Sequence, residues 1–320
     1  MRDRSLTIGV FSPSVLLRVA RAAGLLDRHG LAVVEVPVSS STDQFRGLFD
    51  GDLDAAFTSP DNVIAYRFVR DNPLGRTGDA RILTALDRGL GLAVYARPGS
   101  TGADTLHGTA VGVDVPDSGF AFGLYAVLES LGLKAPVIGV PAAGTSGIGA
   151  SAGDGDYEIR SLGATPRRLT ALLDGRCAAT VLGAGSDLRA EAAGAVRLAG
   201  IAEVCGPYLG TVLTAVGPVR AQAAHALSSA LAQTSRLIVS RVLDPLVLQE
   251  TRAALDLPAD LAARYAARLS DPAEGLVPDG VADRAALETV LGLRLRHRPG
   301  DGSLGTALDP ARGLLDPQAC

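Results

Sequence analysis

The stretch GDLDAAFTSPDN, residues 51–62, decides how this chain is organised. A short apolar strand at 54–57 runs into small polar residues, and a helix is expected to begin at Asp61. A related stretch, GRCAATVLGAGSD, occupies residues 175–187 and also places an apolar strand before a turn of small residues. Two such turns in one chain predict a site that is built from two similar halves.

Strands and helices alternate around the first of these stretches. Strands are expected at residues 6–11, 31–38 and 54–57, and helices at residues 12–30, 39–51 and 61–70. Because strands separated by helices form parallel βαβ units, the first hundred residues predict one α/β lobe.

The same order of elements restarts after residue 110. Residues 111–133 repeat the opening strand, loop and helix, and residues 157–188 repeat the pattern of residues 34–63. Two copies indicate an internal structural repeat of two lobes. Residues 81–100 and 210–218 are expected to cross between the lobes, and residues 219–296 to be mainly helical.

These patterns predict an α/β chain of two lobes, each a mostly parallel sheet flanked by helices, joined by two hinge strands. We expect the first lobe to comprise residues 1–95 and 215–300, the second residues 96–214, and the remainder, 301–320, to be a tail ordered only in part. The glycine-rich residues 142–153 are interpreted as a surface loop, because their glycines lack the spacing of a dinucleotide-binding turn.

Composition excludes several classes of protein. The net charge is −4 without a long basic run, so no nucleic-acid partner is expected. Three widely spaced cysteines and four scattered histidines predict neither a disulfide framework nor a metal site, and no cofactor is expected. No membrane span or signal region is recognised, which predicts a cytoplasmic protein as the sequence stands, or an extracytoplasmic one if a signal was removed.

Small polar residues follow the predicted strands. In parallel α/β lobes, ligands bind beyond the carboxyl ends of the strands, where helix N-termini present unpaired N–H groups. The candidates at these points are Ser12, Ser14, Ser39, Ser40, Ser41, Thr58, Ser59, Asp61, Asp117, Ser118, Thr165, Ser186 and Asp187, with Tyr208 at the rim. Each hydroxyl or carboxylate is also an ordinary helix cap, so the prediction rests on their convergence in one interlobe cleft.

The charge of the ligand is left open by the sequence. If Asp61 and Asp187 face the cleft, they favour an amine or a protonated heterocycle; if they are caps, they are structural. Arg167 or Arg189 could instead clamp an anion, unless both are simply solvated. No nucleophile elbow is present, so an enzyme would depend on acid–base chemistry by Asp61, Asp117 or Asp187.

Several stretches resemble a known family. They are AAGLLDRHGLAVVEVPVSSSTDQFRGLFDGDLDAAFTSPDNVIAY at residues 22–66, LGATPRRLTALLDGRCAATVLG at 162–183, GPYLGTVL at 206–213 and LSDPAEGLVPDG at 269–280. Together they resemble the type II periplasmic solute-binding proteins of the sulfonate/nitrate/thiamine-pyrimidine group, the NMT1/THI5-like family. The resemblance covers about 300 residues. The sequence departs from the family in lacking both a secretion signal and the histidine- and cysteine-rich motif of the pyrimidine-synthase branch.

The resemblance implies hinge closure of two lobes on a small molecule. The resemblance further implies that the family's ligand-binding positions correspond here to Ser12, residues 39–41, residues 58–61, Asp117 to Gly119, and residues 183–187. The first functional hypothesis is therefore a substrate-binding component of an ABC importer, with a permease as partner, or a cytosolic relative. The alternative is a cytosolic decarboxylase, dehydratase or lyase on the same fold. A DNA-binding regulator is disfavoured, because no helix pair fits before residue 6.

Overall fold

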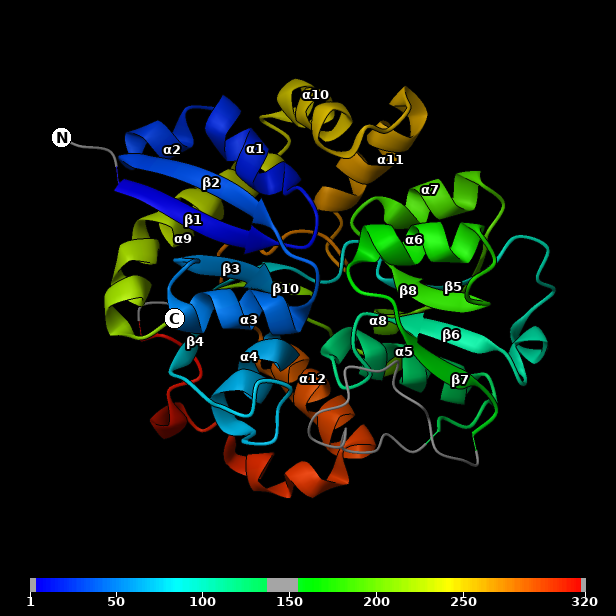
Figure 1. Cartoon of the computed structure of the whole chain (residues 1–320). Coiled ribbons are helices and arrows are strands. Elements are labelled where there is room, and N and C mark those ends of the chain that lie inside the picture. Colours follow the sequence, from blue (N-terminus) through cyan, green and yellow to red (C-terminus); the bar gives the residue numbers. More distant parts are fainter. Residues whose placement is uncertain (1–3, 137–154, 318–320) are drawn as a thin grey trace.

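The computed structural model describes residues 4–136 and 155–317 and shows two α/β lobes side by side (Figure 1). The first lobe has a five-stranded sheet in the order β2-β1-β3-β10-β4. Its strands are β1 (Arg4–Val10), β2 (Leu31–Pro37), β3 (Ala55–Thr58), β4 (Ala80–Asp87) and β10 (Thr211–Val216). The strand that decided the sequence interpretation, β3, is central in this sheet and buried along its length.

The second lobe repeats this topology, with the strand order β7-β6-β8-β5-β9. Its strands are β5 (Ala93–Ala96), β6 (Ala110–Val113), β7 (Glu158–Ser161), β8 (Ala179–Leu182) and β9 (Val196–Gly200). In each sheet the only strand that runs against its neighbours is the one arriving from the other lobe, β10 or β5. The expectation of two mostly parallel sheets with flanking helices is confirmed.

Helices cover both faces of each sheet. Those that follow first-lobe strands are α1 (Val15–Ala22), α2 (Leu25–Arg28), α3 (Ser41–Asp50) and α4 (Pro60–Phe68). The second lobe has η1 (Ala103–Leu106), α5 (Gly119–Ser130), α6 (Thr165–Leu173), α7 (Ser186–Ala192) and α8 (Ile201–Cys205). The C-terminal region adds α9 (Pro218–Val239), α10 (Asp244–Leu255), α11 (Ala259–Leu269), α12 (Arg284–His297), η2 (Pro299–Thr306) and η3 (Pro310–Arg312).

One predicted helix is divided. The helix expected over residues 12–30 is two, α1 and α2, because Gly24 lies between them in the left-handed region at φ 66°. Its backbone turns the chain there, at a conformation that only glycine adopts without strain.

The lobes are joined by two short segments, residues 88–92 between β4 and β5, and residues 206–210 between α8 and β10. The boundaries expected at 95/96 and 214/215 fall inside β5 and β10, whose pairing assigns each strand whole to one sheet. We propose to draw the lobe boundaries in the two connecting segments instead.

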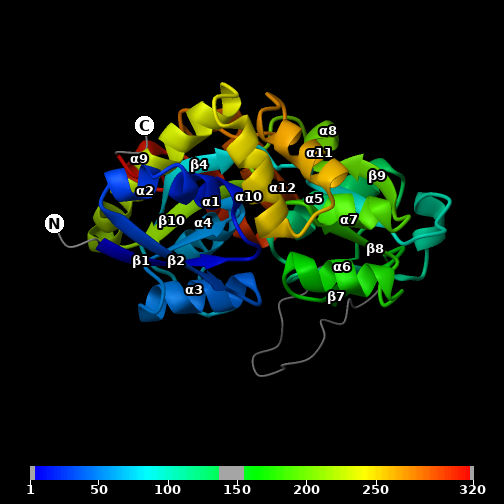
Figure 2. The ribbon, with the colours of Figure 1, turned by 90° about the horizontal axis from the view of Figure 1, so that it is seen from above.

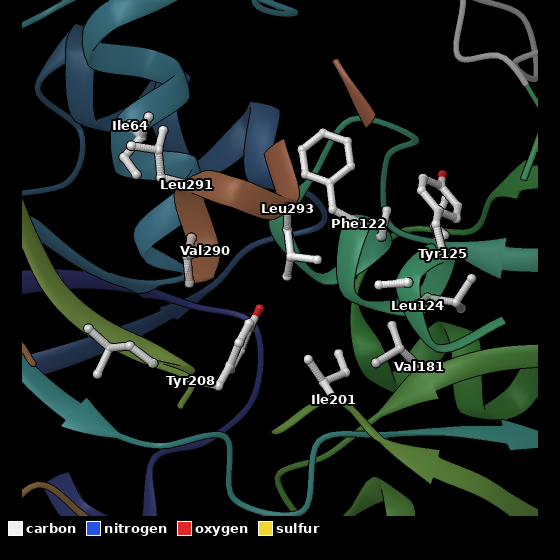
Figure 3. Close-up of a cluster of buried hydrophobic side chains, with 14 of the residues drawn as sticks. Ile64, Phe122, Leu124, Tyr125, Val181, Ile201, Tyr208, Val290, Leu291 and Leu293 are labelled. Atoms are coloured by element: carbon white, nitrogen blue, oxygen red, sulfur yellow. The ribbon is translucent and has the colours of Figure 1, made fainter. Parts of the chain in front are cut away.

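A continuous buried core also connects the lobes. Ile201 and Phe122 of the second lobe, Tyr208 of the hinge and Leu293 of α12 belong to one hydrophobic cluster (Figure 3). Viewed from above, α11 and α12 reach from the first lobe to the junction between the sheets (Figure 2). The hinge therefore has a packed apolar pivot beside its two connecting segments.

The described part of the C-terminal tail packs against the first lobe. Beyond η2 and η3, Leu315 forms a parallel bridge with Ile82, and Asp316 accepts a hydrogen bond from His225 at 3.0 Å. These contacts cover the β4 edge of the first sheet. The loop expected over residues 142–153 lies outside the described residues.

Candidate functional site: the cavity between the lobes

A cavity of about 130 Å³ lies where the two lobes meet at the hinge. On this measure one water needs roughly 10–15 Å³, so the cavity has room for a small organic molecule. The first lobe lines it with the turn after β1, which includes Phe11, Ser12 and Ser14, and with Thr58 and Ser59 at the end of β3. These are carboxyl ends of parallel strands, where the sequence predicted the site.

The second lobe and the hinge close the cavity from the other side. Phe120 lies in the first turn of α5, Thr165 begins α6, and Gly183 follows β8. The hinge contributes Leu90 and Leu92 from one connecting segment and Gly210 from the other, and α11 adds Tyr265. The walls are therefore mainly apolar, with hydroxyl groups at the strand ends, as is usual for small-molecule sites.

Three of the predicted serines are helix caps as well as site residues. Ser14 Oγ accepts from Leu17 N, Ser59 Oγ from Asp61 N, and Ser118 Oγ from Ala121 N. Ser14 and Ser59 line the main cavity, whereas Ser118 lines a small recess that shares Phe11, Ser59, Phe120 and Thr165 with it. Each of these serines can therefore both cap a helix and line the space between the lobes.

The charged residue that lines the cavity is Asp87, at the end of β4 where the chain leaves the first lobe. Its Oδ1 accepts from Gly89 N at 2.8 Å, and it also accepts from the hydroxyl and the backbone N–H of Thr211. Burial raises the pKa of Asp87 to about 6, and these hydrogen bonds partly oppose that rise. The sequence analysis did not single out Asp87.

Asp61 does not line this cavity. It lies in the first turn of α4, after Ser59 and Pro60, rather than at the cap. Its carboxylate is fully buried and is held in bidentate fashion by Arg294 of α12, with Nε–Oδ1 at 2.7 Å and Nη2–Oδ2 at 2.8 Å. The planar guanidinium matches a carboxylate in this geometry, so Asp61 anchors α12 to α4.

Asp187 is placed in the same way in the other lobe. Its Oδ1 accepts from Gly185 N at 2.9 Å, and its Oδ2 pairs with Nη1 of Arg268 of α11 at 2.5 Å. The carboxylate is fully buried. Asp187 therefore joins α7 of the second lobe to the C-terminal helices and lies outside the cavity.

Two further candidates lie beside the cleft. Asp117 lines a separate recess near α4 and α12, where burial raises its pKa against the opposing charges of Arg294 and Arg298. Tyr208 is buried in the core shared by the lobes, with its ring toward α12 (Figure 3), and it lines a second cavity beside the hinge. Neither residue lines the main cavity.

Gly119 is a close-approach position between the lobes. A Cβ atom there would lie 2.5 Å from the Asp61 Cβ and 2.7 Å from the Ser59 Oγ, both on the other lobe. Close contact is also made by the turns at Ser39 and Ala164, where Ala164 N donates to the Ser39 carbonyl at 3.0 Å. The structure thus shows the two lobes in direct contact at these positions.

The remaining predicted serines lie away from the cavity. Ser39 donates to Asp43, Ser40 caps α3 by accepting from Asp43 N, and Ser41 is buried beside the recess of Asp117. Ser186 begins α7 and is half-buried. The Ser/Thr turn after β2 therefore contributes to the contact between lobes rather than to the cavity wall.

The two arginines that were predicted to clamp an anion are exposed, whereas Arg168, next to Arg167 in the chain, is buried. Arg167 is solvated, and Arg189 donates to the carbonyls of Leu255 and Asp256. Arg168 is buried; it donates to the Val181 and Gly163 carbonyls and to Thr165 Oγ1. Asp114 opposes its charge at the small recess. Helical position could have identified Arg168, because it lies on the face of Leu169 and Leu172.

No family model matches the sequence of this chain, and no curated protein matches it. Solved structures do match. One is a conserved gene product of Candida albicans that exhibits the generic periplasmic binding protein structural fold. Its sequence is 14% identical to this one, the match covers 98% of this chain and 96% of the other chain, and the TM-score is 0.63. The chain has the periplasmic-binding-protein fold.

Two other similar structures are of proteins named for what they bind. The alkanesulfonate-binding protein SsuA from Xanthomonas axonopodis pv. citri is 15% identical over 98% of this chain and 95% of its own, with a TM-score of 0.64. The periplasmic nitrate-binding protein NrtA from Synechocystis PCC 6803 is 11% identical over 96% and 85%, with a TM-score of 0.69. At 11–15% sequence identity, the likeness of these structures to this chain shows a shared fold and nothing about the ligand.

Two further findings concern membranes and metal ions. None of the helices described is long and apolar enough to cross a membrane. Within residues 4–136 and 155–317, no group of three or more His, Cys, Asp or Glu side chains could hold a metal ion.

The sequence analysis missed the aromatic walls of the site and its carboxylate. Phe11, Phe120, Tyr265 and Asp87 line the cavity and were not among the candidates. Phe11 and Phe120 lie next to predicted residues, so attention to their neighbours could have found them. Tyr265 is more than 250 residues from Phe11 in sequence, and only the folding of α11 over the hinge brings it there.

Proposed function

We propose that the protein binds a small organic molecule reversibly between its lobes and closes around it. The observation that carries this proposal is the cavity at the junction of two lobes that have the periplasmic-binding-protein fold. Proteins of this fold close by rotating two lobes about a hinge. The closed contacts at Ser39 and Gly119 fit the ligand-bound end of such a motion.

The most specific role that we propose is recognition of a solute for an ABC importer, or a cytosolic binding role on the same fold. Similar structures support the importer role, since they include a ligand-binding component of an ABC-type import system from Staphylococcus aureus. A permease partner belongs to this proposal.

One observation keeps an enzyme as the second candidate. Asp87 borders the cavity with a pKa raised to about 6 by burial, which suits a carboxylate for proton transfer near neutral pH. The carboxylates first considered for that role, Asp61, Asp117 and Asp187, do not line the cavity.

The test is mass spectrometry of the purified protein after incubation with a pool of sulfonates, aromatic carboxylates, pyrimidines and amines. A compound retained by the protein and released unchanged is the expected result. A compound consumed in excess over protein, with a new mass appearing, would instead establish an enzyme. If nothing is retained and nothing is consumed, the binding proposal fails.

A pair of variants locates the site. Ser12→Trp is expected to abolish retention, because the indole would fill the cavity beside Ser12. Val219→Trp, at a 79% exposed position on α9, adds the same side chain away from the cavity and should retain the compound as the wild type does. Equal retention by the two variants would place the ligand elsewhere.

A further inference from the structure

The charges around the cavity are one-sided, and this bears on which ligands it accepts. Of the described residues that line it, none is Lys, Arg or His, and Asp87 is the one ionisable carboxylic acid. A bound anion would have no cationic side chain to meet its charge, and it would lie close to a carboxylate. Charges taken out of water without a partner are costly, so this lining disfavours anions.

The helix N-termini beside the cavity could in principle supply positive charge instead. Two of them, one in each lobe, already carry a carboxylate that accepts a backbone N–H. Ser14 N donates to Glu35 Oε1 at 2.8 Å before α1, and Gly185 N donates to Asp187 Oδ1 before α7. One N–H group at each of these two helix ends is therefore already taken by a carboxylate of the protein itself.

Two further N-termini, those of α4 and α5, are opposed in a similar way. Asp61 lies in the first turn of α4, and Ser118, the cap of α5, donates its hydroxyl to Asp114. The serine caps also take one N–H group of each of these helices. These four ends therefore offer little unopposed positive charge to the cavity. The N-terminus of α6, at Thr165, differs, because it has neither a side-chain cap nor an acidic residue in its first turn.

One buried cation borders the recess that adjoins the cavity. Arg168 borders the adjoining recess, where its donors are engaged by two carbonyls and Thr165 Oγ1, and Asp114 opposes its charge. An anion placed there would compete with Asp114. The remaining walls, among them Phe11, Phe120 and Tyr265, suit an apolar body.

Resting on the proposed binding function, we infer that the cleft selects cationic or uncharged molecules with an apolar body, with Asp87 as the group that favours positive charge, and rejects anions. This ligand class differs from the sulfonate and the nitrate for which two similar proteins are named. The cavity volume of about 130 Å³ suits a molecule of about the size of a single substituted ring.

Four matched one-ring probes test this inference: benzylamine, benzyl alcohol, benzoate and benzenesulfonate. Their affinities are measured with the wild-type protein by ligand-observed NMR titration at neutral pH. Benzylamine and benzyl alcohol are expected to bind at least tenfold more tightly than either anion. Anions that bind as tightly as benzylamine, or an anion as the compound retained from the mixed pool, would overturn the inference while leaving the binding function intact.

The role of Asp87 is tested by Asp87→Asn. The variant should lose most of the preference for benzylamine over benzyl alcohol. A purely structural role at the hinge would change the affinities for both probes alike, so an unchanged ratio would overturn the assignment to Asp87. The matched control is Asp54→Asn, whose carboxylate accepts Thr7 N at 2.8 Å and does not line the cavity. If Asp87→Asn does not fold, the wild-type probe series still decides the charge preference.

Discussion

At the scale of single residues, the buried carboxylates act as anchors. Asp61 and Asp187 were attractive ligand-binding candidates because each follows a strand and opens a helix. In the structure, each is paired with an arginine from the C-terminal helices, Arg294 or Arg268, which come from more than 80 residues away. Their function is to fix α11 and α12 across the junction between the lobes.

Asp61→Ala is expected to destabilise the protein strongly. Removing one partner of a buried, hydrogen-bonded pair leaves the other charge uncompensated, which typically lowers the free energy of unfolding by about 3–5 kcal/mol. Urea denaturation of wild type and variant measures the change. Adding Arg294→Met to Asp61→Ala should recover part of the loss, because the unpaired guanidinium is then absent.

The control for this prediction is Glu288→Ala. Glu288 pairs with Arg284 at 2.9 Å on the exposed surface of α12, with side chains 55% and 69% exposed. Surface pairs of this kind contribute about 0.2–1 kcal/mol. If Asp61→Ala cost no more than Glu288→Ala, the anchoring role of Asp61 would be wrong.

At the scale of elements, helix boundaries depend on backbone conformation at single glycines. Gly24→Ala is expected to lower the free energy of unfolding by about 1–2 kcal/mol, since Gly24 separates α1 from α2 at φ 66° and alanine is strained there. No atom lies within 4 Å of a Cβ at Gly24, so a steric clash would not contribute. Thermal or urea denaturation gives the value.

Gly292→Ala is the opposite case in α12. This glycine is helical and exposed, and a Cβ there would also meet nothing within 4 Å. Alanine should therefore stabilise the protein by about 0.4–1 kcal/mol. Two glycine-to-alanine changes with the same sign would contradict this account of the break between α1 and α2.

At the scale of the whole molecule, function depends on how closely the lobes approach. In Gly119→Ala, the added Cβ would lie within 3 Å of Asp61 and Ser59 on the other lobe, so full closure should be blocked. Alanine favours α5 itself, which leaves the second lobe intact. We expect at least a tenfold loss of affinity for the compound retained from the pool, or about 1.4 kcal/mol.

Small-angle scattering checks the mechanism of that loss. The radius of gyration of the wild type should fall when the retained compound binds, and that of Gly119→Ala should fall less. Gly292→Ala, which makes no contact between lobes, should behave as the wild type does. Normal affinity in Gly119→Ala would show that binding does not require the lobes to meet at this position.

The sequence by itself determined the repeated α/β lobes, the crossing strands and the helical C-terminal region. These follow from local hydrophobic periodicity and turn residues, which depend on near neighbours in the chain. It also predicted that Ser12, Ser14, Thr58 and Ser59 lie beyond strand ends, and these residues line the cavity. That prediction succeeded because parallel strands place their carboxyl ends at one edge of a sheet.

Only the tertiary structure decided which charges face the cavity. Whether a carboxylate after a strand is a cap, an anchor or a ligand-binding group depends on its partner, and the partners of Asp61 and Asp187 come from distant helices. Asp87 reaches the cavity because two connecting segments meet at the hinge, and Tyr265 because α11 folds over it. Such contacts are long-range, and burial and ion pairing between distant segments have no signature in local sequence.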